Sequence, residues 1–561
     1  MFTHKKLLTH ILIVIPLLIF SASKVFAVTE FDTNFENIYQ FDQSGNVNVI
    51  HKIELINNLS HIYPTVYNLA LNSSEIENIE VSVQSATVKA DVEKTLGLTT
   101  LHIPIANPAI GKAQKTLLEV KYKSTSFAEK IGDTYTLTLP KTQKGNEATS
   151  FVRQVIIPDD FPELSYSSIT PQATEKIESN SQRSYRFIGH GSDTLTLHFG
   201  KSATYDVSLK YQLKNTTSIA ATTEIALPPD TPYQKVYLHE LEPKPLEIVV
   251  DPDGNWLARY QLAPLEKRTV TANLSLTVTN SPLYFDPSIS SPLGESKYWQ
   301  RNQAINRLAE QLKTPKNIYD YLTSNLSYDY TNINEHKRLG AEKALESPNS
   351  AICTEFSDLF VTLARSSSIP ARSLIGYAYS QNQNQRPQAT AKDILHAFAE
   401  YYDSSQKKWI AIDPTWGHTT HGSEYFDRLD FAHLVFVRWG LESDYPLPAG
   451  SYITDSIAKQ LNITIRKENL ENASPEFTVE KTTNGDYIIN TGHTAIINTD
   501  LTVENTKTYV KYLPPFGKHR LNNQSIIKSW QKYSNLYLLG LIFIIVWPVI
   551  AYLKKHKTHV K

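Results

Sequence analysis

The sequence predicts a multidomain protein in which all-β sandwich domains flank a mixed α+β core, followed by one C-terminal transmembrane helix. The chain has 561 residues, several times the ~100–150 residues of a typical single domain. Short β-rich runs separated by polar turns fill most of it, which is typical of sandwiches. Helical periodicity is concentrated after about residue 296. An uncharged apolar run occupies 536–553.

Residues 1–27 are predicted to be a secretory signal peptide. Lys5 and Lys6 give a positively charged start, and an apolar stretch runs from Leu7 to Phe20. Val25-Phe26-Ala27 then offers small residues at the two positions that a signal peptidase reads. We expect cleavage after Ala27. A retained anchor is the alternative, but the run is short for a bilayer span of about 20 residues.

Residues 28–140 and 141–290 are each predicted to form a β-sandwich domain. Val47 to Leu55 follows the turn signal Ser44-Gly45-Asn46, and Tyr205 to Leu213 alternates apolar with polar residues in the same way. Asp251-Pro252-Asp253-Gly254-Asn255 marks a strong turn in the second segment.

Residues 296–440 are predicted to form the α+β core, and 452–515 a further small β-domain. Ile305, Leu308 and Leu312 fit one helical face, and Thr314-Pro315 is typical of a helix start with proline at its first position. After the core, the pattern returns to short β-rich runs.

The run 536–553 is predicted to cross a membrane, because 18 residues at about 1.5 Å each span roughly a hydrocarbon core. Lys554, Lys555, Lys557 and Lys561 follow it, so the positive-inside rule places the tail 554–561 in the cytoplasm. Together with the signal peptide, this predicts a single-pass type I protein of the cell membrane, with most of the chain outside the cytoplasm.

Charge and cysteine content narrow the function. Lys and Arg number 55 against 56 Asp and Glu, a net charge of −1, so the chain has no electrostatic footprint for nucleic acid. Cys353 is the one cysteine of the sequence. It cannot form an intramolecular disulfide, so it is an inert buried thiol, an intermolecular link or a nucleophile.

The setting of Cys353 favours the nucleophile. Phe356, Leu359, Phe360 and Leu363 follow it at the spacing of one buried helical face, so we expect a helix that begins at Cys353. A helix N-terminus stabilises an anion and hence a reactive thiolate. A cysteine before an amphipathic helix can also be simply a packed apolar residue.

His396 and Asp413 are predicted to meet at one end of a β-hairpin. His396 begins the strand-like run 396–402, the polar turn 403–408 follows, and Asp413 ends the run 409–413. Antiparallel pairing of the two runs brings these ends together. A histidine beside a carboxylate can serve the thiol as a base.

Several segments, in this order, resemble the transglutaminase-like family: Asn349-Ser350-Ala351-Ile352-Cys353-Thr354-Glu355-Phe356, Ile369-Pro370-Ala371-Arg372, Gly376-Tyr377, His396-Ala397-Phe398 and Asp413-Pro414-Thr415. That family has a papain-like fold and includes transglutaminases, microbial proteases and peptide N-glycanase. The resemblance covers about 296–440, and the whole chain resembles bacterial surface proteins that place β-domains before such a core.

The resemblance implies a catalytic triad. Cys353 would be the nucleophile, His396 the general base and later acid, and Asp413 the group that orients His396. The family commonly has Gly at the position of Ala351 and Trp at that of Phe398. The backbone N–H of Cys353 would be one oxyanion donor, with Tyr328 and Tyr330 as candidates for the second.

No metal or other cofactor is predicted. His418, His421 and His433 suggest zinc, but no cysteine or acidic pair accompanies them at a zinc-like spacing. Arg365 and Arg372 are expected to brace the junction between the helix and the next strand.

Three functions remain open at the level of sequence. The first is an extracytoplasmic thiol hydrolase, a cysteine protease or amidase, that acts on protein or peptide substrates. The second is a transamidase that cross-links proteins, since the acyl acceptor depends on pocket shape. The third is a surface module that binds a partner without catalysis. Of these, we expect the hydrolase.

Overall fold

The structure is a computed structural model of the whole chain. It describes residues 30–521 except 74, 96–97, 141–149, 190, 192–193, 284–291, 332–336, 381–385, 388, 392, 421–424, 427, 452–460, 468–469, 471–473 and 504–505. The predicted signal peptide 1–27 lies outside the described residues.

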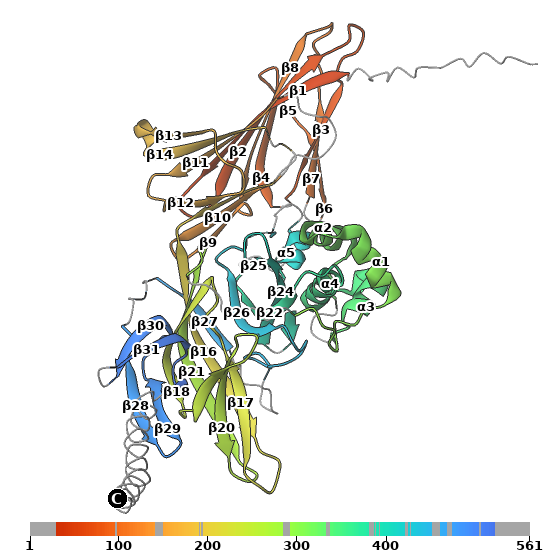
Figure 1. Cartoon of the computed structure of the whole chain (residues 1–561). Helices are drawn as coiled ribbons and strands as arrows, with labels where there is room; N and C mark the ends of the chain where they lie inside the picture. The colour runs from red at the N-terminus through yellow and green to blue at the C-terminus, as the bar shows by residue number, and fades with distance from the viewer. Residues whose placement is uncertain are drawn as a thin grey trace, which may run out of the picture.

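The first unit is a β-sandwich over about 31–199 (red to olive in Figure 1). Its sheets have the strand orders β13-β14-β11-β1-β2-β8-β4-β5, β12-β15-β10-β9 and β3-β7-β6. The strands are β1 Phe31–Phe41, β2 Val47–Asn57, β3 Val66–Leu71, β4 Ile76–Val83, β5 Ala86–Val88, β6 Asp91–Thr95, β7 Leu98–Pro104, β8 Lys115–Ser124, β9 Ala128–Ile131, β10 Thr134–Leu139, β11 Ser150–Pro158, β12 Leu164–Ser167, β13 Ala173–Ile177, β14 Gln182–Ile188 and β15 Leu195–Phe199, with a 3-10 turn at Glu178–Asn180.

The alternation of buried and exposed side chains along the strands explains why this segment forms a sandwich. Along β2, every second residue is buried, which gives the strand one apolar face. Side chains from the three sheets share one hydrophobic core. Strands beyond residue 140 complete it, because β11 pairs in parallel with β1 and β15 pairs with β10. The first sandwich therefore extends past residue 140.

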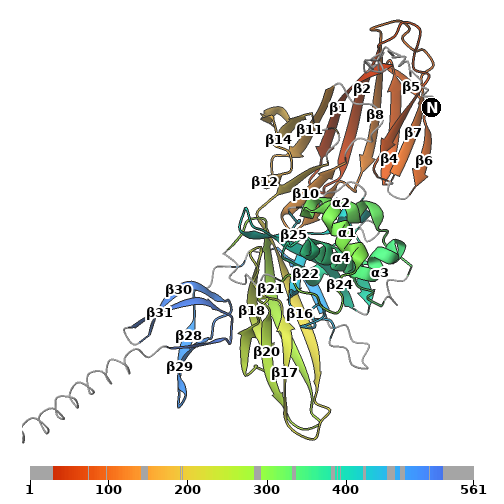
Figure 2. The same cartoon turned by 45° about the vertical axis from the view of Figure 1, so that its right-hand side comes forward.

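The second sandwich is built from β16 Ser202–Lys214, β17 Ala221–Leu227, β18 Gln234–Glu242, β19 Glu247–Val250, β20 Trp256–Leu262, β21 Lys267–Thr279 and β27 Leu461–Arg466. Its sheets have the orders β18-β21-β16-β27 and β17-β20-β19. β27 lies beyond the α+β core in sequence, yet it pairs antiparallel with β16. The core is therefore inserted between two strands of this sandwich (Figure 2).

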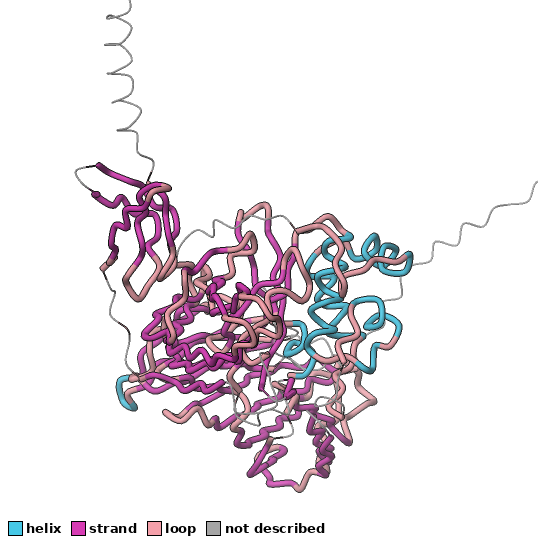
Figure 3. Tube along the Cα trace, turned by 90° about the horizontal axis from the view of Figure 1, so that it is seen from below, coloured by secondary structure: helices cyan, strands magenta, loops and turns pink. Residues whose placement is uncertain are grey.

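The α+β core contains the helices and one sheet, of order β23-β24-β22-β26 with β25 beside β24. The helices gather on one side of the molecule (cyan in Figure 3), and α4 packs on β22 and β24. The elements are α1 Gln303–Leu312, α2 Pro315–Asn325, α3 Ala341–Glu346, a 3-10 turn at Pro348–Ser350, α4 Cys353–Ser366, β22 Ala371–Ala378, β23 Ala389–Ala391, β24 Asp393–Asp403, β25 Lys408–Ile412, α5 Pro414–Thr419 and β26 His433–Trp439. The predicted start of α2, with Thr314 as N-cap and Pro315 first, is confirmed.

The second sandwich holds the core from the β26 side. Buried side chains of β26, including Leu434 and Phe436, belong to the hydrophobic core of this sandwich. Gln234 donates from Nε2 to the Val435 carbonyl at 2.9 Å and accepts the Val435 N–H at 2.9 Å. The sheet that carries the candidate site is therefore fixed against a second domain.

A smaller β unit follows, made of β28 Phe477–Thr482, β29 Gly485–Asn490, β30 Ile496–Val503, β31 Thr506–Leu513 and β32 Lys518–Arg520. It has a small hydrophobic core of its own and appears in blue in Figure 1.

One part of the predicted fold class is corrected. It included a C-terminal transmembrane helix, but no helix among residues 30–521 is long and apolar enough to cross a membrane. Those residues are mostly β-sheet with few helices. The predicted span 536–553 and the tail 554–561 lie outside the described residues.

Candidate active site

Cys353 is the first residue of α4, as predicted. The residue before it, Ile352, is extended, and its N–H is accepted by Glu355 Oε2 at 3.1 Å, so the side chain of the first turn folds back over the helix start. Phe356, Leu359, Phe360 and Leu363 are buried in the core beneath the helix. The first N–H groups of a helix lack partners within it, so the N–H of Cys353 is free of the helix ladder.

The predicted hairpin is confirmed, because β24 and β25 pair antiparallel from Ala399–Ile412 to Asp403–Lys408. Asp413 follows β25 and is the N-cap of α5. Its Oδ1 accepts the N–H groups of Thr415 at 2.9 Å and Trp416 at 3.1 Å. Its Oδ2 lies 2.8 Å from Nε2 of His396 on β24. One carboxylate thus both starts a helix and orients a histidine.

The structure brings the three predicted site residues together. Nδ1 of His396 is buried and has no conventional hydrogen-bond partner among the described residues. The thiol of Cys353 is close enough to this ring to help raise its pKa. Exposure is 1% for Cys353 and 0% for His396 and Asp413, so water screens their charges little.

Burial alone lowers the pKa of His396, yet the net shift is upward. The charge of Asp413, its hydrogen bond to the ring and the Cys353 thiol together raise the pKa of His396 to about 9. For Asp413, burial raises the pKa, but the charge and hydrogen bond of His396 and those of His433 hold it below its usual range. The pair is therefore an imidazolium and a carboxylate at neutral pH.

Of the two tyrosines proposed as oxyanion donors, Tyr328 lies beside the thiol. It forms a bridge with Ala351, two residues before Cys353, and Asp329 N–H donates to the Ala351 carbonyl at 2.9 Å. Its hydroxyl is buried with no partner among the described residues. Burial and the neighbouring Cys353 raise the pKa of Tyr328, so it stays protonated. The Tyr330 ring lies edge-on to the Tyr328 ring, with ring centroids 4.9 Å apart, and Tyr330 is 41% exposed.

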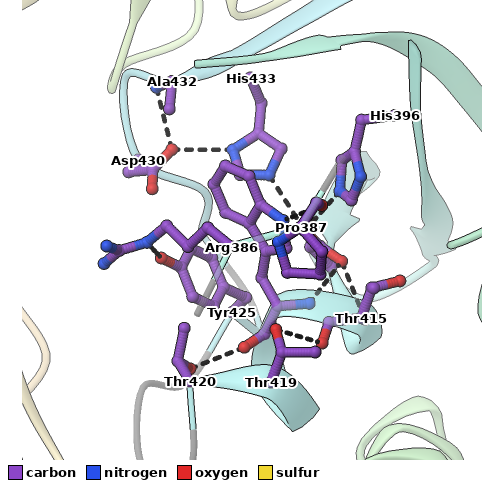
Figure 4. A network of polar contacts seen from close by, with 12 residues as sticks. Arg386, Pro387, His396, Thr415, Thr419, Thr420, Tyr425, Asp430, Ala432 and His433 are labelled. Carbon is purple, nitrogen blue, oxygen red and sulfur yellow. Dashed lines mark hydrogen bonds and ion pairs between the residues drawn. The ribbon is translucent and has the colours of Figure 1, made fainter. Parts of the chain in front are cut away.

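Sequence reasoning missed the place of His433 in this site, because it weighed that residue only as a zinc ligand. Its Nε2 lies 3.2 Å from Asp413 Oδ2, and its Nδ1 lies 2.8 Å from Asp430 Oδ1 (Figure 4). His433 begins β26, whose register with β22 places it in the site. The spacing Asp430-x-x-His433 was the available signal.

The other histidines considered for zinc do not join the site. His418 Nδ1 lies 2.9 Å from the Thr323 carbonyl, and His421 lies outside the described residues. The ligand atoms of His396, Asp413 and His433 all lie within 4.8 Å of one another, a spacing that a metal ion could use. Both histidines direct Nε2 at Asp413 Oδ2, so these atoms are engaged with one another as hydrogen-bond partners.

Arg365 and Arg372 act at the helix–strand junction, as predicted. Arg365 donates from Nε and Nη2 to the Ala371 carbonyl at 2.9 and 2.7 Å, which ties the end of α4 to the start of β22. Arg372 pairs with Glu400 on the neighbouring strand.

Comparison with known proteins agrees with these motifs. Residues 300–414 match the family model of the transglutaminase-like superfamily, whereas no curated protein matches the chain. Among solved structures, a candidate cysteine protease from Cytophaga hutchinsonii is 16% identical with a TM-score of 0.32, covering 48% of this chain and 90% of that one. The periplasmic domain of TgpA from Pseudomonas aeruginosa is 13% identical with a TM-score of 0.22, covering 40% and 99%.

An M1 zinc metallopeptidase from Deinococcus radiodurans is 8% identical with a TM-score of 0.23. The match covers 34% of this chain and 45% of the metallopeptidase. TM-scores this low carry no argument about function. The family match covers the stretch that holds Cys353, His396 and Asp413, and it ends at Pro414, the first residue of the helix that Asp413 caps. The chain therefore carries a transglutaminase-like domain over residues 300–414.

Proposed function

We propose that this protein is a thiol enzyme that transfers acyl groups from peptide or amide substrates through Cys353, His396 and Asp413. The observation that supports it most is the position of His396. One ring nitrogen is held by Asp413 at 2.8 Å, the other has no conventional partner in the described part of the chain, and the Cys353 thiol lies near the ring. A nucleophile, a base and an orienting carboxylate are the parts that covalent acyl transfer needs.

The reaction would proceed in two stages. Nδ1 of His396 already holds the thiol proton of Cys353, so Sγ attacks the carbonyl carbon as a thiolate, which leaves an oxyanion. His396 then returns that proton to the departing amine as the carbon–nitrogen bond breaks, and a thioester remains. A water molecule attacks the thioester, gives a proton to His396, and the acid leaves as the thiol reforms.

Two donors are placed to stabilise the oxyanion. The N–H of Cys353 is free because it begins α4, and we assign the Tyr328 hydroxyl as the second donor because it is buried and unpaired beside the thiol. Donors that are fixed before the reaction lower the barrier more than mobile water does.

Hydrolysis is favoured over cross-linking in this proposal. Because Cys353 is 1% exposed, the smaller acceptor, water, reaches a thioester more easily than a lysine of a second protein. The extracytoplasmic location rests on the predicted signal peptide 1–27 and stays a prediction.

The test is alkylation of Cys353 by iodoacetamide in the full chain, measured across about pH 5–10. We expect rapid labelling near pH 6, because the imidazolium of His396 stabilises a thiolate there. In His396→Ala, labelling at pH 6 should fall by about 10² or more and rise only towards the ~8.5 of a free thiol. Asp413→Asn should give an intermediate loss, because His396 is then neither held nor charged.

The matched control is His102→Ala, which removes a half-exposed histidine of the first sandwich. It should label like the wild type. If the wild type labels slowly and neither site substitution changes the rate, Cys353 is an inert thiol. The third function, a surface module that binds a partner without catalysis, would then be the better account.

A further inference from the structure

We infer that His433, locked by Asp430, is a positioning residue of this site: it holds Asp413 in place for His396 and supplies a second fixed cation beside it. The inference rests on the proposed function, which it deepens. The site is then a chain of four residues, Asp430, His433, Asp413 and His396, and does not end at Asp413. Figure 4 labels Asp430, His433 and His396.

The partners of His433 determine its protonation. Nε2 faces Asp413 Oδ2 at 3.2 Å, and Nδ1 faces Asp430 Oδ1 at 2.8 Å. An ionised carboxylate accepts hydrogen bonds and donates none. His433 must therefore donate from both ring nitrogens, which makes it an imidazolium. Burial lowers its pKa, but the charges and hydrogen bonds of Asp430 and Asp413 raise it to about 9.

Asp430 is itself fixed. Its Oδ1 also accepts the Ala432 N–H at 2.9 Å, and the side chain is 1% exposed. Burial raises its pKa, but the charge and hydrogen bond of His433 and the charge of Arg386 more than offset this, so the pKa is lowered. The four side chains from Asp430 to His396 thus carry alternating negative and positive charges, so each buried charge is compensated by its neighbour.

Aromatic rings leave His433 no room to turn away. Its ring centroid lies 4.6 Å from that of Trp416, 5.1 Å from Phe398 and 6.0 Å from Tyr425. The His396 ring is 5.8 Å away. Among the described residues, Arg386 and Glu129 also bring charge to this group: Arg386 donates to the Tyr425 hydroxyl at 2.8 Å, and Glu129 of the first sandwich lies 3.7 Å from Arg386.

Two effects on the proposed chemistry follow. First, the hydrogen bonds that Asp413 Oδ2 accepts from the described residues come from His396 and His433, so His433 limits how that oxygen can move away from His396. Second, two cations that share one carboxylate repel each other, and each lowers the pKa of the other. Removing the charge of His433 should therefore let His396 keep its proton to higher pH.

The test compares two reagents on Cys353 of the full chain, neutral iodoacetamide and anionic iodoacetate, across pH. A neighbouring imidazolium attracts the anion, so the ratio of iodoacetate to iodoacetamide rates falls where His396 loses its proton. In His433→Gln, we expect both rates near pH 7 to fall by about tenfold, as for other supporting residues of a site, and the fall in the ratio to move to higher pH.

In Asp430→Asn, the pH at which the rate ratio falls should also move upwards, but the two alkylation rates should decrease less. The reason is that a neutral His433 can still donate from Nε2 to Asp413. His102→Gln is the control for the same chemical change away from the site. If both rates drop equally at every pH and the ratio does not move, His433 is merely structural and the inference is overturned. The inference is also overturned if neither His433→Gln nor Asp430→Asn changes the rates or the ratio.

A second measurement does not depend on Cys353 or on the variants being active. Nitrogen-15 NMR of the histidine rings in the wild-type chain should show one buried histidine, absent in His433→Gln, with both nitrogens protonated at neutral pH. Slow wild-type alkylation would reject the proposed function and leave this result untouched. Stoichiometric zinc that is lost in His433→Gln would overturn the imidazolium, because a metal needs a deprotonated ring nitrogen.

Discussion

At the scale of single residues, Asp413 combines two tasks that are usually separate. Oδ1 caps α5 through the N–H groups of Thr415 and Trp416, and Oδ2 receives the two histidines. The cap fixes the carboxylate plane before any substrate binds, so His396 meets an acceptor that cannot rotate freely. An N-cap is worth about 1 kcal/mol, and here that interaction also sets the geometry of the site.

The hydroxyl of Tyr328 gives a prediction at this scale. In Tyr328→Phe, acylation of Cys353 by an activated ester should slow by about 10²–10³, because an oxyanion donor is lost. Alkylation by iodoacetamide forms no oxyanion, so its rate should stay at the wild-type value. The two rates can be followed in one preparation by mass spectrometry.

Equal slowing of both reactions in Tyr328→Phe would show that the ring supports the fold around Cys353 and is not a donor. Tyr330→Phe is the matched control, since its ring adjoins Tyr328 but is partly exposed. It should leave both rates unchanged.

At the scale of elements, the site depends on how tightly β22 sits between its neighbours. Gly376 of β22 is paired with His396 on β24, and the pairing with β26 has an irregularity at the same point. A Cβ on Gly376 would lie 1.8 Å from the Leu434 carbonyl oxygen. Glycine is therefore needed for β26, which carries His433, to lie this close to β22, the strand that pairs with the strand of His396.

Gly376→Ala should cost about 3 kcal/mol or more of unfolding free energy, since the clash is with backbone that cannot repack. Chemical denaturation followed by fluorescence measures this directly. Gly294→Ala is the control, because a Cβ there meets nothing within 4 Å. Equal stability of the two variants would mean that β26 is not held where the structure places it.

Sequence periodicity predicts these elements well where the signal is local. The helix at Cys353 and the hairpin between His396 and Asp413 follow from residues within about two turns or one tight loop, and both are confirmed. His433 and the free hydroxyl of Tyr328 could not be assigned in this way. Their positions depend on the pairing of β22 with β26 and on the bridge between Tyr328 and Ala351, which join distant segments.

At the scale of the whole molecule, buried histidines of two kinds shape the response to pH. His396 and His433 have pKa values raised to about 9, whereas burial lowers the pKa of His51 to about 3 and that of His198 to about 4. The unfolded chain titrates all of them near 6.5. The two pairs therefore affect stability in opposite directions.

We expect the unfolding free energy to be highest near pH 6.5. Above it, the unfolded chain releases protons that folded His396 and His433 retain, so stability is lost until about pH 9. Below pH 6.5, the unfolded chain binds protons that His51 and His198 do not bind in the folded state, so stability is lost towards pH 3–4. Asp230, with a pKa raised to about 7, offsets part of the acid loss.

Urea denaturation at intervals of pH measures the acid and alkaline sides of this stability profile. On the alkaline side, we expect the unfolding free energy to fall with a slope of the order of 1–2 kcal/mol per pH unit. His433→Gln should flatten the alkaline side alone, and His51→Asn the acid side alone. A profile that rises steadily to pH 9 would contradict the charged state assigned to His396 and His433.

The pairing of β16 with β27 bears on how the protein is made. Synthesis delivers β16 long before β27, and the whole α+β core emerges between them. Until then β21 covers one edge of β16 while the other edge stays open, and an open edge is a template for pairing with another nascent chain. The second sandwich is thus completed only after the α+β core, by its most distant strand. A ribosome pause or a chaperone that shields this edge should therefore raise the yield of folded protein.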